Sequence, residues 1–417
     1  MLMGLLSFQE IAQLDMNPLN ALRENGRLVA FGFFMCLCSS VGQTFFISLF
    51  NGEIRRMFSL THGDIGTMYA AGTIASAATL MVAGRLVDRV RLSLVVTFVL
   101  GGLAAAALGM GLLWSAMVLP VAFFVLRLFG QGLTSHTGMT AMGRYFTATR
   151  GRAISLAALG YSAGEAILPS AVIVLLGYLS WQSIWLGISA VVLASLPVAL
   201  YLLGGKPPTE TEGFSTQATA PREHWRLGEA LTERGFWFRM PTLISPAFIL
   251  TGFFFHQVHL AGEKGWPLPL IAGSFTGYAV SSIVTGLLSG PLVDRCSARK
   301  VWPWILLPMM AGCMVLWAFN ASWIAPLFMI LFGISTGLYG IASTAIWPEL
   351  YGTRHLGAIK AFVQSVMVLA SGLSPALFGL LIDRGIPLEQ VALACGLWCL
   401  SAGLLAMFTN HSPQRSA

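Results

Sequence analysis

The stretch AGRLVDRVRLS (Ala83–Ser93) has a near copy, SGPLVDRCSARK (Ser289–Lys300), that begins 206 positions later in the chain. Both contain Gly-x-Leu-Val-Asp-Arg followed by further basic residues, and each follows a long apolar run. At the same offset three further pairs of residues are identical: Tyr145 and Tyr351, Gly151 and Gly357, and Pro169 and Pro375. We therefore expect two structural repeats that lie in the same orientation.

The composition favours lipid as the surroundings of this chain. The 417 residues are 56% hydrophobic and only 10% charged, whereas soluble domains have about 25% charged residues. The net charge of +7 does not indicate a nucleic-acid-binding domain, because the basic residues are dispersed along the chain. The six cysteines lie mostly within apolar runs, where cysteine behaves as a small hydrophobic residue, so no disulfide framework is expected.

Runs of about twenty apolar residues, the length that a helix needs to cross a bilayer, predict an all-α membrane protein with twelve transmembrane helices. The runs lie near 28–50, 64–84, 94–113, 116–138, 153–177, 182–203, 239–262, 268–290, 300–318, 323–345, 356–382 and 386–408. They form two pseudo-symmetric bundles of six helices. The expected segments are a lead at 1–27, bundles at 28–203 and 239–408, a polar linker at 204–238 and a tail at 409–417.

The distribution of lysine and arginine predicts the orientation of these helices. With a cytoplasmic N-terminus, 19 of the 24 basic residues fall on the cytoplasmic side and 4 on the outer side, while Arg127 falls within a helix. Cytoplasmic loops of membrane proteins carry this excess of basic residues. The N-terminal segment lacks the basic start of a cleaved signal peptide. We expect both termini in the cytoplasm and a location in a bacterial inner membrane.

The duplicated phrase resembles the signature loop of the major facilitator superfamily of transporters. LRLFGQG (Leu126–Gly132) is similar to the fourth-helix motif of that family. GRYFTATRGRAISLAALGYSAGEAILP and WPELYGTRHLGAIKAFVQSVMVLASGLSPALFGLLID resemble its monocarboxylate-porter-like branch. The resemblance implies that the two bundles rock about a central site, and that the first, fourth, seventh and tenth helices line the cavity.

The two copies of the loop are expected to form a conformational latch between the halves, as the resemblance implies. Glycine permits a close approach and a turn, and an aspartate near a helix N-terminus is stabilised by the helix dipole. The latch residues are Gly84, Asp88, Arg89, Gly290, Asp294 and Arg295. Basic residues that only fix the orientation are the alternative interpretation.

Arg127 and Glu165 are the two ionisable residues predicted to lie near the middle of the membrane, where charges are costly and usually functional. They lie at similar depth on neighbouring antiparallel helices, so they could meet. In the functional interpretation Arg127 binds an anion or takes part in proton coupling, and Glu165 carries a proton. In the alternative, they form a static buried pair.

Other polar residues within the helices are weaker candidates for the cavity. His256 and His259 share a helix face, where a metal or proton site is conceivable, although interfacial polar residues are more common there. Gln257 lies on a different face of the helix from these two histidines. Further candidates are Gln43, Tyr161, Tyr278, Tyr339 and Gln364. GYSAG at Gly160–Gly164 fits the hydrolase pattern G-x-S-x-G, but that pattern requires a strand before it, so a helix-packing surface is the better interpretation.

The sequence thus predicts a secondary transporter of a small organic solute that is coupled to protons, with a carboxylate as the candidate class of solute. We expect no enzyme activity, cofactor or metal, and a monomer in the bilayer without nucleic acid as a partner. The absence of a G-x-x-x-x-G-K-[ST] loop favours an ion or substrate gradient as the energy source. Efflux of hydrophobic compounds is the first alternative, favoured by Phe45, Phe46 and Phe253–Phe255. A membrane sensor that transports nothing is the second.

Overall fold

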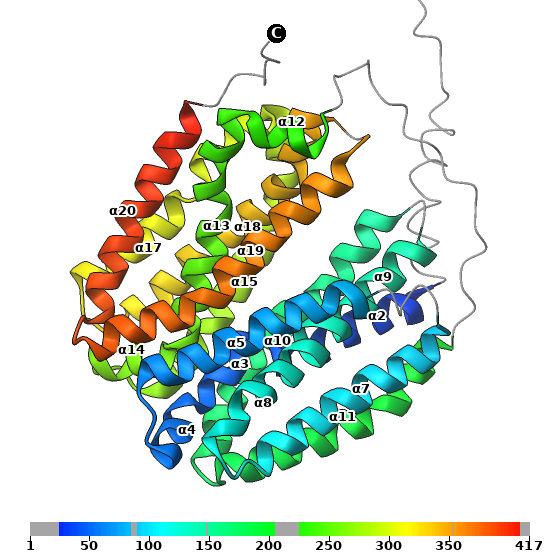
Figure 1. Ribbon diagram of the computed structural model, residues 1–417, viewed down its shortest axis with the longest axis vertical. Helices are drawn as coiled ribbons and strands as arrows, with labels where there is room; N and C mark the ends of the chain where they lie inside the picture. Colours follow the sequence, from blue (N-terminus) through cyan, green and yellow to red (C-terminus); the bar gives the residue numbers. More distant parts are fainter. Residues whose placement is uncertain (1–24, 85–89, 147–148, 205–224, 353, 409–417) are drawn as a thin grey trace, which may run out of the picture.

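The computed structural model describes residues 25–84, 90–146, 149–204, 225–352 and 354–408. The first half contains the following helices, in chain order: α2 (Gly26–Ser39), η1 (Ser40–Gly42), α3 (Thr44–Ile47), η2 (Ser48–Phe50), α4 (Asn51–Phe58), α5 (His62–Ala83), α7 (Leu92–Gly111), η3 (Ala116–Val118), α8 (Leu119–Leu126), η4 (Arg127–Thr134), α9 (Ser135–Tyr145), α10 (Arg150–Leu176) and α11 (Trp181–Leu203). Figure 1 shows these helices as one bundle.

The second half forms the other bundle in Figure 1. Its helices are α12 (Leu227–Thr232), α13 (Arg234–Phe255), α14 (Gln257–Lys264), α15 (Leu268–Cys296), α16 (Ala298–Val301), η5 (Trp302–Trp304), α17 (Leu307–Ala318), α18 (Ile324–Tyr351), α19 (Leu356–Asp383) and α20 (Leu388–Met407). The seventh long helix, α13, begins at Arg234 rather than at 239, and the short helix α12 lies within the predicted linker.

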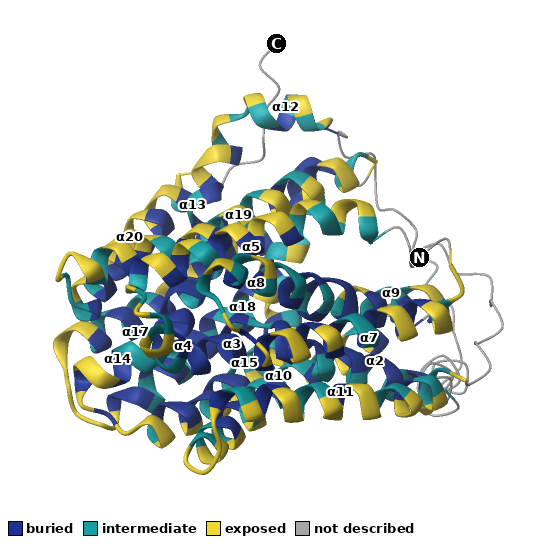
Figure 2. Cartoon of the chain, turned by 60° about the horizontal axis from the view of Figure 1, so that its bottom comes forward, coloured by how far each residue is buried: buried dark blue, intermediate teal, exposed yellow. Residues whose placement is uncertain are grey.

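The number of membrane-crossing helices agrees with the prediction. The described residues contain eleven helices that are long and apolar enough to span a bilayer, or twelve when the bent pair Gly26–Gly42 and Thr44–Phe58 counts as one span. Helices satisfy their backbone hydrogen bonds internally, as lipid requires. Large apolar side chains are exposed on the outer faces, for example Leu193 on α11 and Leu404 on α20, and Figure 2 shows exposed residues along both helices.

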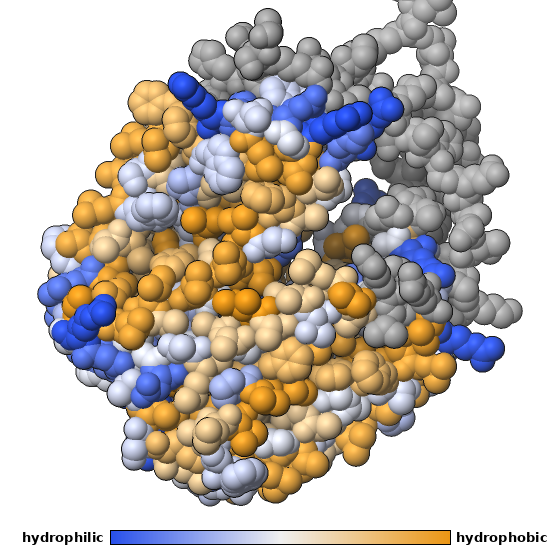
Figure 3. All heavy atoms as spheres, in the orientation of Figure 1, coloured by the Kyte–Doolittle hydropathy of each residue, from blue (hydrophilic) through white to orange (hydrophobic). Residues whose placement is uncertain are grey.

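The polar side chains gather at the ends of the helices. In Figure 3 hydrophobic side chains cover most of the visible face between hydrophilic patches near α12 and near α14. We call the end that bears α12, the N-terminal start of α2 and the C-terminal end of α20 the terminal side, and the opposite end, which bears α4 and α14, the far side. An apolar band between polar ends is the surface that a bilayer requires.

Small residues bring the helices of each half together, as the sequence predicts for Gly160-xxx-Gly164. A Cβ atom added at Gly160 would lie 2.1 Å from the carbonyl oxygen of Phe33, and one at Gly164 would lie 2.0 Å from the Ser40 hydroxyl. The equivalent contact in the second half is made by Gly333, where an added Cβ atom would lie 2.1 Å from the Ser281 hydroxyl. Glycine thus allows α10 to pack closely on α2, and α18 on α15.

The two halves contact each other on the far side. In the described part of the chain, seven hydrogen bonds join them. Their donor and acceptor residues are Ser48 and Phe254, Asn51 and Phe255, Gln257 and Phe45, Gln257 and Ser48, His62 and Asp383, Gly63 and Asp383, and Thr276 and Ala166. All of these residues lie in the half of the bundle nearer to the far side, so the interface is closed at that end.

Candidate central cavity and far-side gate

Two irregular helices face each other inside the first half. The first membrane helix breaks after Gly42, where Gln43 adopts extended backbone angles between η1 and α3, and the two parts are bent by 46°. The fourth membrane helix widens into a π-helix, η4, over Arg127–Thr134. Broken helices mark binding sites in transporters, and π-helical turns often occur at functional sites. The pairing of both irregularities makes this region the candidate site.

Close backbone contact explains why glycine occupies both irregular segments. A Cβ atom added at Gly42 would lie 2.4 Å from the carbonyl oxygen of Leu126, and one at Gly130 would lie 2.5 Å from the Cα atom of Gly42. Real Cβ atoms do not approach backbone atoms so closely, so any larger residue would push the two helices apart. The contact places the broken end of η1 beside the start of η4.

Arg127 lies at this junction, with only 4% of its surface exposed. Its Nη1 atom donates to the Gly42 carbonyl oxygen at 3.2 Å and lies 3.4 Å from the Thr44 hydroxyl. The guanidinium carbon lies 5.4 Å from the centre of the Tyr69 ring, a cation–π contact. Its Nε atom has no hydrogen-bond partner among the described residues, and no carboxylate there forms an ion pair with it. The charge is thus held by neutral groups.

A cavity of about 690 Å³ lies between the two halves and includes Arg127 in its wall. The first half contributes Gln43, Thr73, Ser76, Ala77, Leu80, Arg127, Gln131, Gly132, Ser135, His136, Met139 and Tyr161, and the second half Ala247, Gln364, Met367, Val368 and Ser371. The only charged residue in this lining is Arg127, apart from histidine. The polar groups of the wall therefore concentrate on the first half.

The structure corrects the expected set of cavity helices. The first, fourth and seventh membrane helices do reach the cavity, but the tenth, α18, does not, while α5, α10 and α19 do. Tyr339 on α18 instead donates its hydroxyl to the Met367 sulfur at 3.0 Å, behind the cavity wall. Of the predicted candidates, the lining contains Gln43, Arg127, Tyr161 and Gln364. The lining also contains Gln131, Ser135 and His136, which follow Arg127 along the same span and were not among the predicted candidates.

Arg127 and Glu165 are not brought together. No hydrogen bond or ion pair joins them in the described part of the chain, and Glu165 is absent from the cavity lining. The residues next to Glu165 show where it lies: Gly164 packs on Ser40, and the Ala166 carbonyl oxygen accepts a hydrogen bond from Thr276 of α15. Glu165 is therefore at the contact of α10 with the second half.

His256 and Gln257 lie in the far-side gate rather than in the cavity. We use this term for the contacts among Ser48, Asn51, His62, Gly63, His256, Gln257, His259 and Asp383. Gln257 is 1% exposed and donates from Nε2 to the Phe45 carbonyl oxygen and the Ser48 hydroxyl, both at 2.8 Å. Asp383 accepts hydrogen bonds from the backbone N–H groups of His62 at 3.0 Å and Gly63 at 2.7 Å. It thus caps α5 from the other half.

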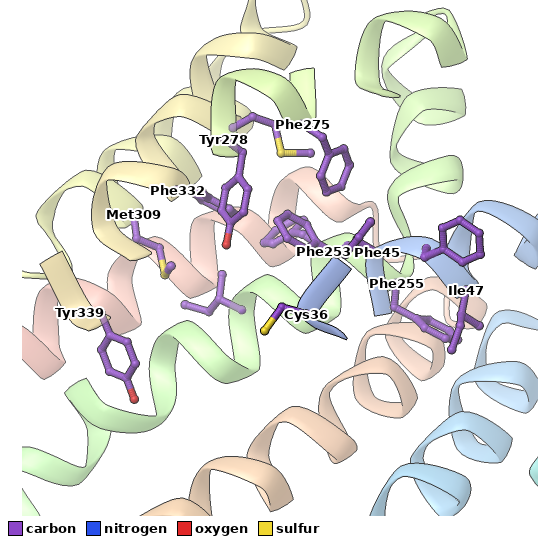
Figure 4. Close-up of a cluster of buried hydrophobic side chains, with 14 of the residues drawn as sticks. Cys36, Phe45, Ile47, Phe253, Phe255, Phe275, Tyr278, Met309, Phe332 and Tyr339 are labelled. Atoms are coloured by element: carbon purple, nitrogen blue, oxygen red, sulfur yellow. The ribbon is translucent and has the colours of Figure 1, made fainter. Parts of the chain in front are cut away.

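Aromatic side chains seal the space beneath this gate. Figure 4 shows Phe45 of the first half among Phe253, Phe275 and Tyr278 of the second. The Phe45 and Phe275 rings are 5.9 Å apart between centres, and Phe254 lies 4.9 Å from Phe275. Tyr278 is part of this seal, since its hydroxyl bonds to Thr336 at 3.3 Å and its ring packs on Phe254. Tyr278 is therefore a core residue in this conformation and does not line the cavity.

The second signature phrase occupies a different setting from the one expected. In the first phrase, Gly84 directly follows the last residue of α5, and Asp88 and Arg89 lie outside the described residues. In the second copy, Gly290, Asp294 and Arg295 lie within α15, so this phrase is helical rather than a loop, and Asp294 is near the helix C-terminus. A Cβ atom added at Gly290 would meet nothing within 4 Å.

Glu349 has the capping role that was expected of Asp294. Its carboxylate accepts the Ala298 N–H at 2.9 Å and a hydrogen bond from the Ser297 hydroxyl, at the start of α16. Asp294 is exposed and makes no hydrogen bond or ion pair within the described residues. Among the described residues, Asp294 therefore makes no contact that would form part of a latch.

Comparison with known proteins gives a consistent result. A model of the Major Facilitator Superfamily matches residues 32–275 and 248–417. The curated protein "Monocarboxylate transporter 11" of Homo sapiens is 27% identical over 281 residues, which is 61% of this chain and 55% of that relative. The chain thus matches about half the length of this relative.

Solved structures show the same fold. A bacterial homologue of the human lysosomal transporter Spinster, in an inward-facing and unoccupied conformation, superposes with a TM-score of 0.70 at 14% identity, covering 94% of this chain and 99% of that one. The occupied inward-facing form gives a TM-score of 0.68 at 14% identity, covering 94% and 98%. The family match spans both halves, and the relatives are transporters rather than enzymes. The chain belongs to the major facilitator superfamily of multi-pass membrane transporters.

Proposed function

We propose that this chain is a proton-coupled secondary transporter of a small organic anion, with a carboxylate as the recognised group. Arg127 carries the proposal, because it is a buried cation in the wall of a cavity and has no carboxylate partner among the described residues. Burying a charge is costly unless it is paired with an opposite charge. An anionic substrate would provide that partner.

The geometry of arginine favours a carboxylate over a halide or another simple anion. A guanidinium group presents a planar fork that matches the two oxygens of a carboxylate, whereas lysine offers a point charge. Around Arg127 the cavity wall supplies Gln43, Gln131 and Ser135, which can bind further polar groups of the solute. The printed name of the human relative, a monocarboxylate transporter, agrees with this choice.

Efflux of a hydrophobic compound has less support from this cavity. That alternative was motivated by Phe45, Phe46 and Phe253–Phe255, which are all buried. They pack in the core and the far-side seal, and Tyr161 is the one aromatic residue in the lining. A cavity with one cation and several amide and hydroxyl groups suits a polar anion better.

Glu165 is our candidate for the proton carrier. It lies where α10 meets α15 of the other half, beside the hydrogen bond from Thr276 to the Ala166 carbonyl oxygen. When the halves rock, the surroundings of its carboxyl group change, and a change in solvation alters the proton affinity of a carboxyl group. This proposal does not require contact with Arg127, which distinguishes it from a static ion pair.

The orientation of the helices gives the direction of access. We propose that the terminal side is cytoplasmic, which makes this conformation inward-facing, and that the halves 28–203 and 239–408 rock as units. The signature-phrase residues Asp88 and Asp294 would then form a latch on the cytoplasmic side once that side closes. We further propose that the protein acts as a monomer in a bacterial inner membrane.

Transport assays in proteoliposomes test these proposals. A panel of labelled carboxylates should be compared with the corresponding neutral amides, with and without a pH gradient. We expect at least one carboxylate to accumulate when a gradient is imposed, while its amide does not. Amides that accumulate as well as the acids would contradict anion recognition at Arg127.

The variant Glu165→Gln separates proton coupling from substrate binding. The amide keeps the size of the side chain but cannot ionise, so the variant should still exchange substrate across the membrane while losing accumulation against a gradient. Glu53→Gln, which changes an exposed far-side carboxylate, is the matched control. If Glu165→Gln accumulates substrate with an unchanged pH dependence, Glu165 has only a structural role.

A further inference from the structure

Three histidine rings meet across the far-side gate. His62 comes from the start of α5 in the first half, whereas His256 and His259 come from the start of α14 in the second. The His62 ring centre lies 4.1 Å from that of His259 and 5.6 Å from that of His256. Because the three rings come from both halves, the cluster exists only while the gate is closed.

The cluster borders a small cavity that can hold water. This cavity has a volume of about 70 Å³ and is lined by the three histidines together with Asn51 and Arg55. One water molecule needs roughly 10 to 15 Å³ of such volume. Water at this position would let protons reach the imidazole nitrogens without opening the gate.

The charged groups around the cluster limit how many protons it can hold. His259 Nε2 lies 2.9 Å from a carboxylate oxygen of Glu263 on the same helix without the geometry of a hydrogen bond, so a positive charge on His259 would have an opposite charge close by. Asp383 on α19 has both carboxylate oxygens bonded to the backbone N–H groups at the start of α5. Arg55 on α4 adds positive charge next to the cavity, and Asp64 on α5 is occupied with capping Thr61.

His256 is placed differently from the other two histidines. It is 3% exposed, and its Nε2 atom lies 2.9 Å from the Pro375 carbonyl oxygen of α19, so it donates a hydrogen bond there. Its ring is stacked on Phe378. Among the described residues, every carboxylate near this ring already accepts other hydrogen bonds, so a positive charge on the ring would have no unoccupied partner.

We infer that His62, His256 and His259 form a proton-binding site in the far-side gate, and that the gate opens once more than one of the three rings is protonated. Two imidazolium rings in contact repel each other, and Arg55 adds to that repulsion. Opening separates His62 from the other two and exposes all three to water. The open gate therefore binds more protons than the closed gate, so acid on the far side favours opening.

This site is distinct from Glu165 and from the cavity, and its test needs no substrate. The full chain in lipid nanodiscs is labelled with spin labels at Arg56→Cys on α4 and Gln390→Cys on α20, two exposed far-side positions in opposite halves. Cys296, the exposed native cysteine, is replaced by serine. The distance between the labels is then measured from about pH 8 to about pH 5, a range that spans the titration of histidine.

The expected result is a shift towards longer distances as the pH falls below about 6.5, where exposed histidines of the open gate bind protons. Burial lowers the pKa of His256 in the closed gate, so the midpoint of opening should lie below the pKa of a free histidine. His62→Asn and His259→Gln should each reduce the shift at least about threefold. His355→Asn, which changes a histidine at the start of α19 on the terminal side, should leave it unchanged. If His62→Asn does not fold, the change in distance measured for His259→Gln tests the role of the cluster.

Two results would overturn the inference. The first is an unchanged distance in the parent protein over the whole pH range. The second is a shift that persists in both histidine variants, because other groups would then be responsible.

Discussion

The two ends of the contact between the halves differ in how they are built. On the far side, hydrogen bonds cross from one half to the other at Ser48, Asn51, Gln257 and Asp383, above an aromatic seal. Towards the terminal side the halves enclose the cavity, and no hydrogen bond between them lies beyond the middle of the described helices. One end is closed while the other gives access to Arg127, which is the arrangement that alternating access requires.

The chemistry of the closed end suits a gate that must open again. Three of the seven hydrogen bonds between the halves are accepted by backbone carbonyl groups where helices end or break, those of Phe45, Phe254 and Phe255. Such groups lack a helical partner and can bind water instead. Each exchange of a protein partner for water changes the free energy by only about 0.5 to 1.5 kcal/mol. A gate made of several such bonds is closed firmly but reversibly.

The largest expected effect concerns the open end. Arg127→Met removes the buried cation and should reduce transport of the carboxylate substrate by about 100-fold, since charged hydrogen bonds contribute about 1.5 to 3 kcal/mol each. Arg127→Lys should also bind substrate weakly because lysine lacks the planar fork. Arg144→Met, an exposed change at the end of the same span, is the control. Uptake at matched expression measures the effect, and a fully active Arg127→Met would remove the basis for anion recognition.

A second change tests whether the irregular helices form the site. Gly42→Ala places a methyl group 2.4 Å from the Leu126 carbonyl oxygen, and such overpacking costs about 1 to 3 kcal/mol. Thermal unfolding in detergent should show a lower midpoint than for the parent protein. Gly340→Ala, where an added Cβ meets nothing within 4 Å, should be neutral. Equal midpoints for the two variants would show that the Gly42 contact is unimportant.

The signature phrase offers a comparison between conformations. Asp294→Asn changes an exposed residue that makes no ion pair in the described part of the chain, so protein abundance in the membrane should stay close to that of the parent. Transport should nevertheless fall by roughly tenfold if the latch forms when the terminal side closes; a shift of about 1.4 kcal/mol in that equilibrium would suffice. Unchanged transport by both Asp294→Asn and Asp88→Asn would contradict the latch.

The smallest effect is expected at Asp383. Asp383→Asn keeps one carbonyl oxygen as an acceptor but removes the charge that caps α5, at a largely exposed position. We expect the closed far-side gate to lose about 0.5 to 1 kcal/mol of stability. The fraction of molecules with the longer distance between spin labels at Arg56→Cys and Gln390→Cys should rise a few-fold. Arg384→Gln, the neighbouring charge, should leave that fraction unchanged.

The sequence predicted the long-range plan of the molecule better than its local contacts. Hydropathy and the duplicated phrase specify the spans, because lipid exposure and helix length act on whole segments. They do not reveal the break at Gln43 or the π-helix at Arg127, since these depend on the contact of Gly42 with Gly130. The depth of Arg127 and Glu165 could be estimated, but depth does not give the direction of a side chain around the helix axis. Glu165 therefore lies towards α15 instead.

The far-side gate was the least predictable part. His256 and Gln257 attract attention as polar residues in an apolar run, yet their partners are backbone carbonyl groups of Phe45 and Pro375. Any residue supplies a carbonyl group, so no side-chain pattern identifies such partners. Asp383 is similar, because the carboxylate binds two backbone N–H groups 320 positions away in the chain.

Alternating access itself can be tested most directly by forcing the closed end open. Gly66→Val places a side chain where an added Cβ atom would lie 2.4 Å from the Pro375 carbonyl oxygen, between α5 and α19 in the far half of the interface. Gly273→Val, on α15 with nothing within 4 Å of an added Cβ, is the control.

Distances are measured with spin labels at Arg56→Cys and Gln390→Cys on the far side and, in a second sample, at Arg144→Cys and Lys360→Cys on the terminal side. We predict that Gly66→Val lengthens the far-side distance and shortens the terminal-side distance, while the control changes neither. A longer far-side distance with an unchanged terminal-side distance would show that the two ends move independently, and would contradict the account.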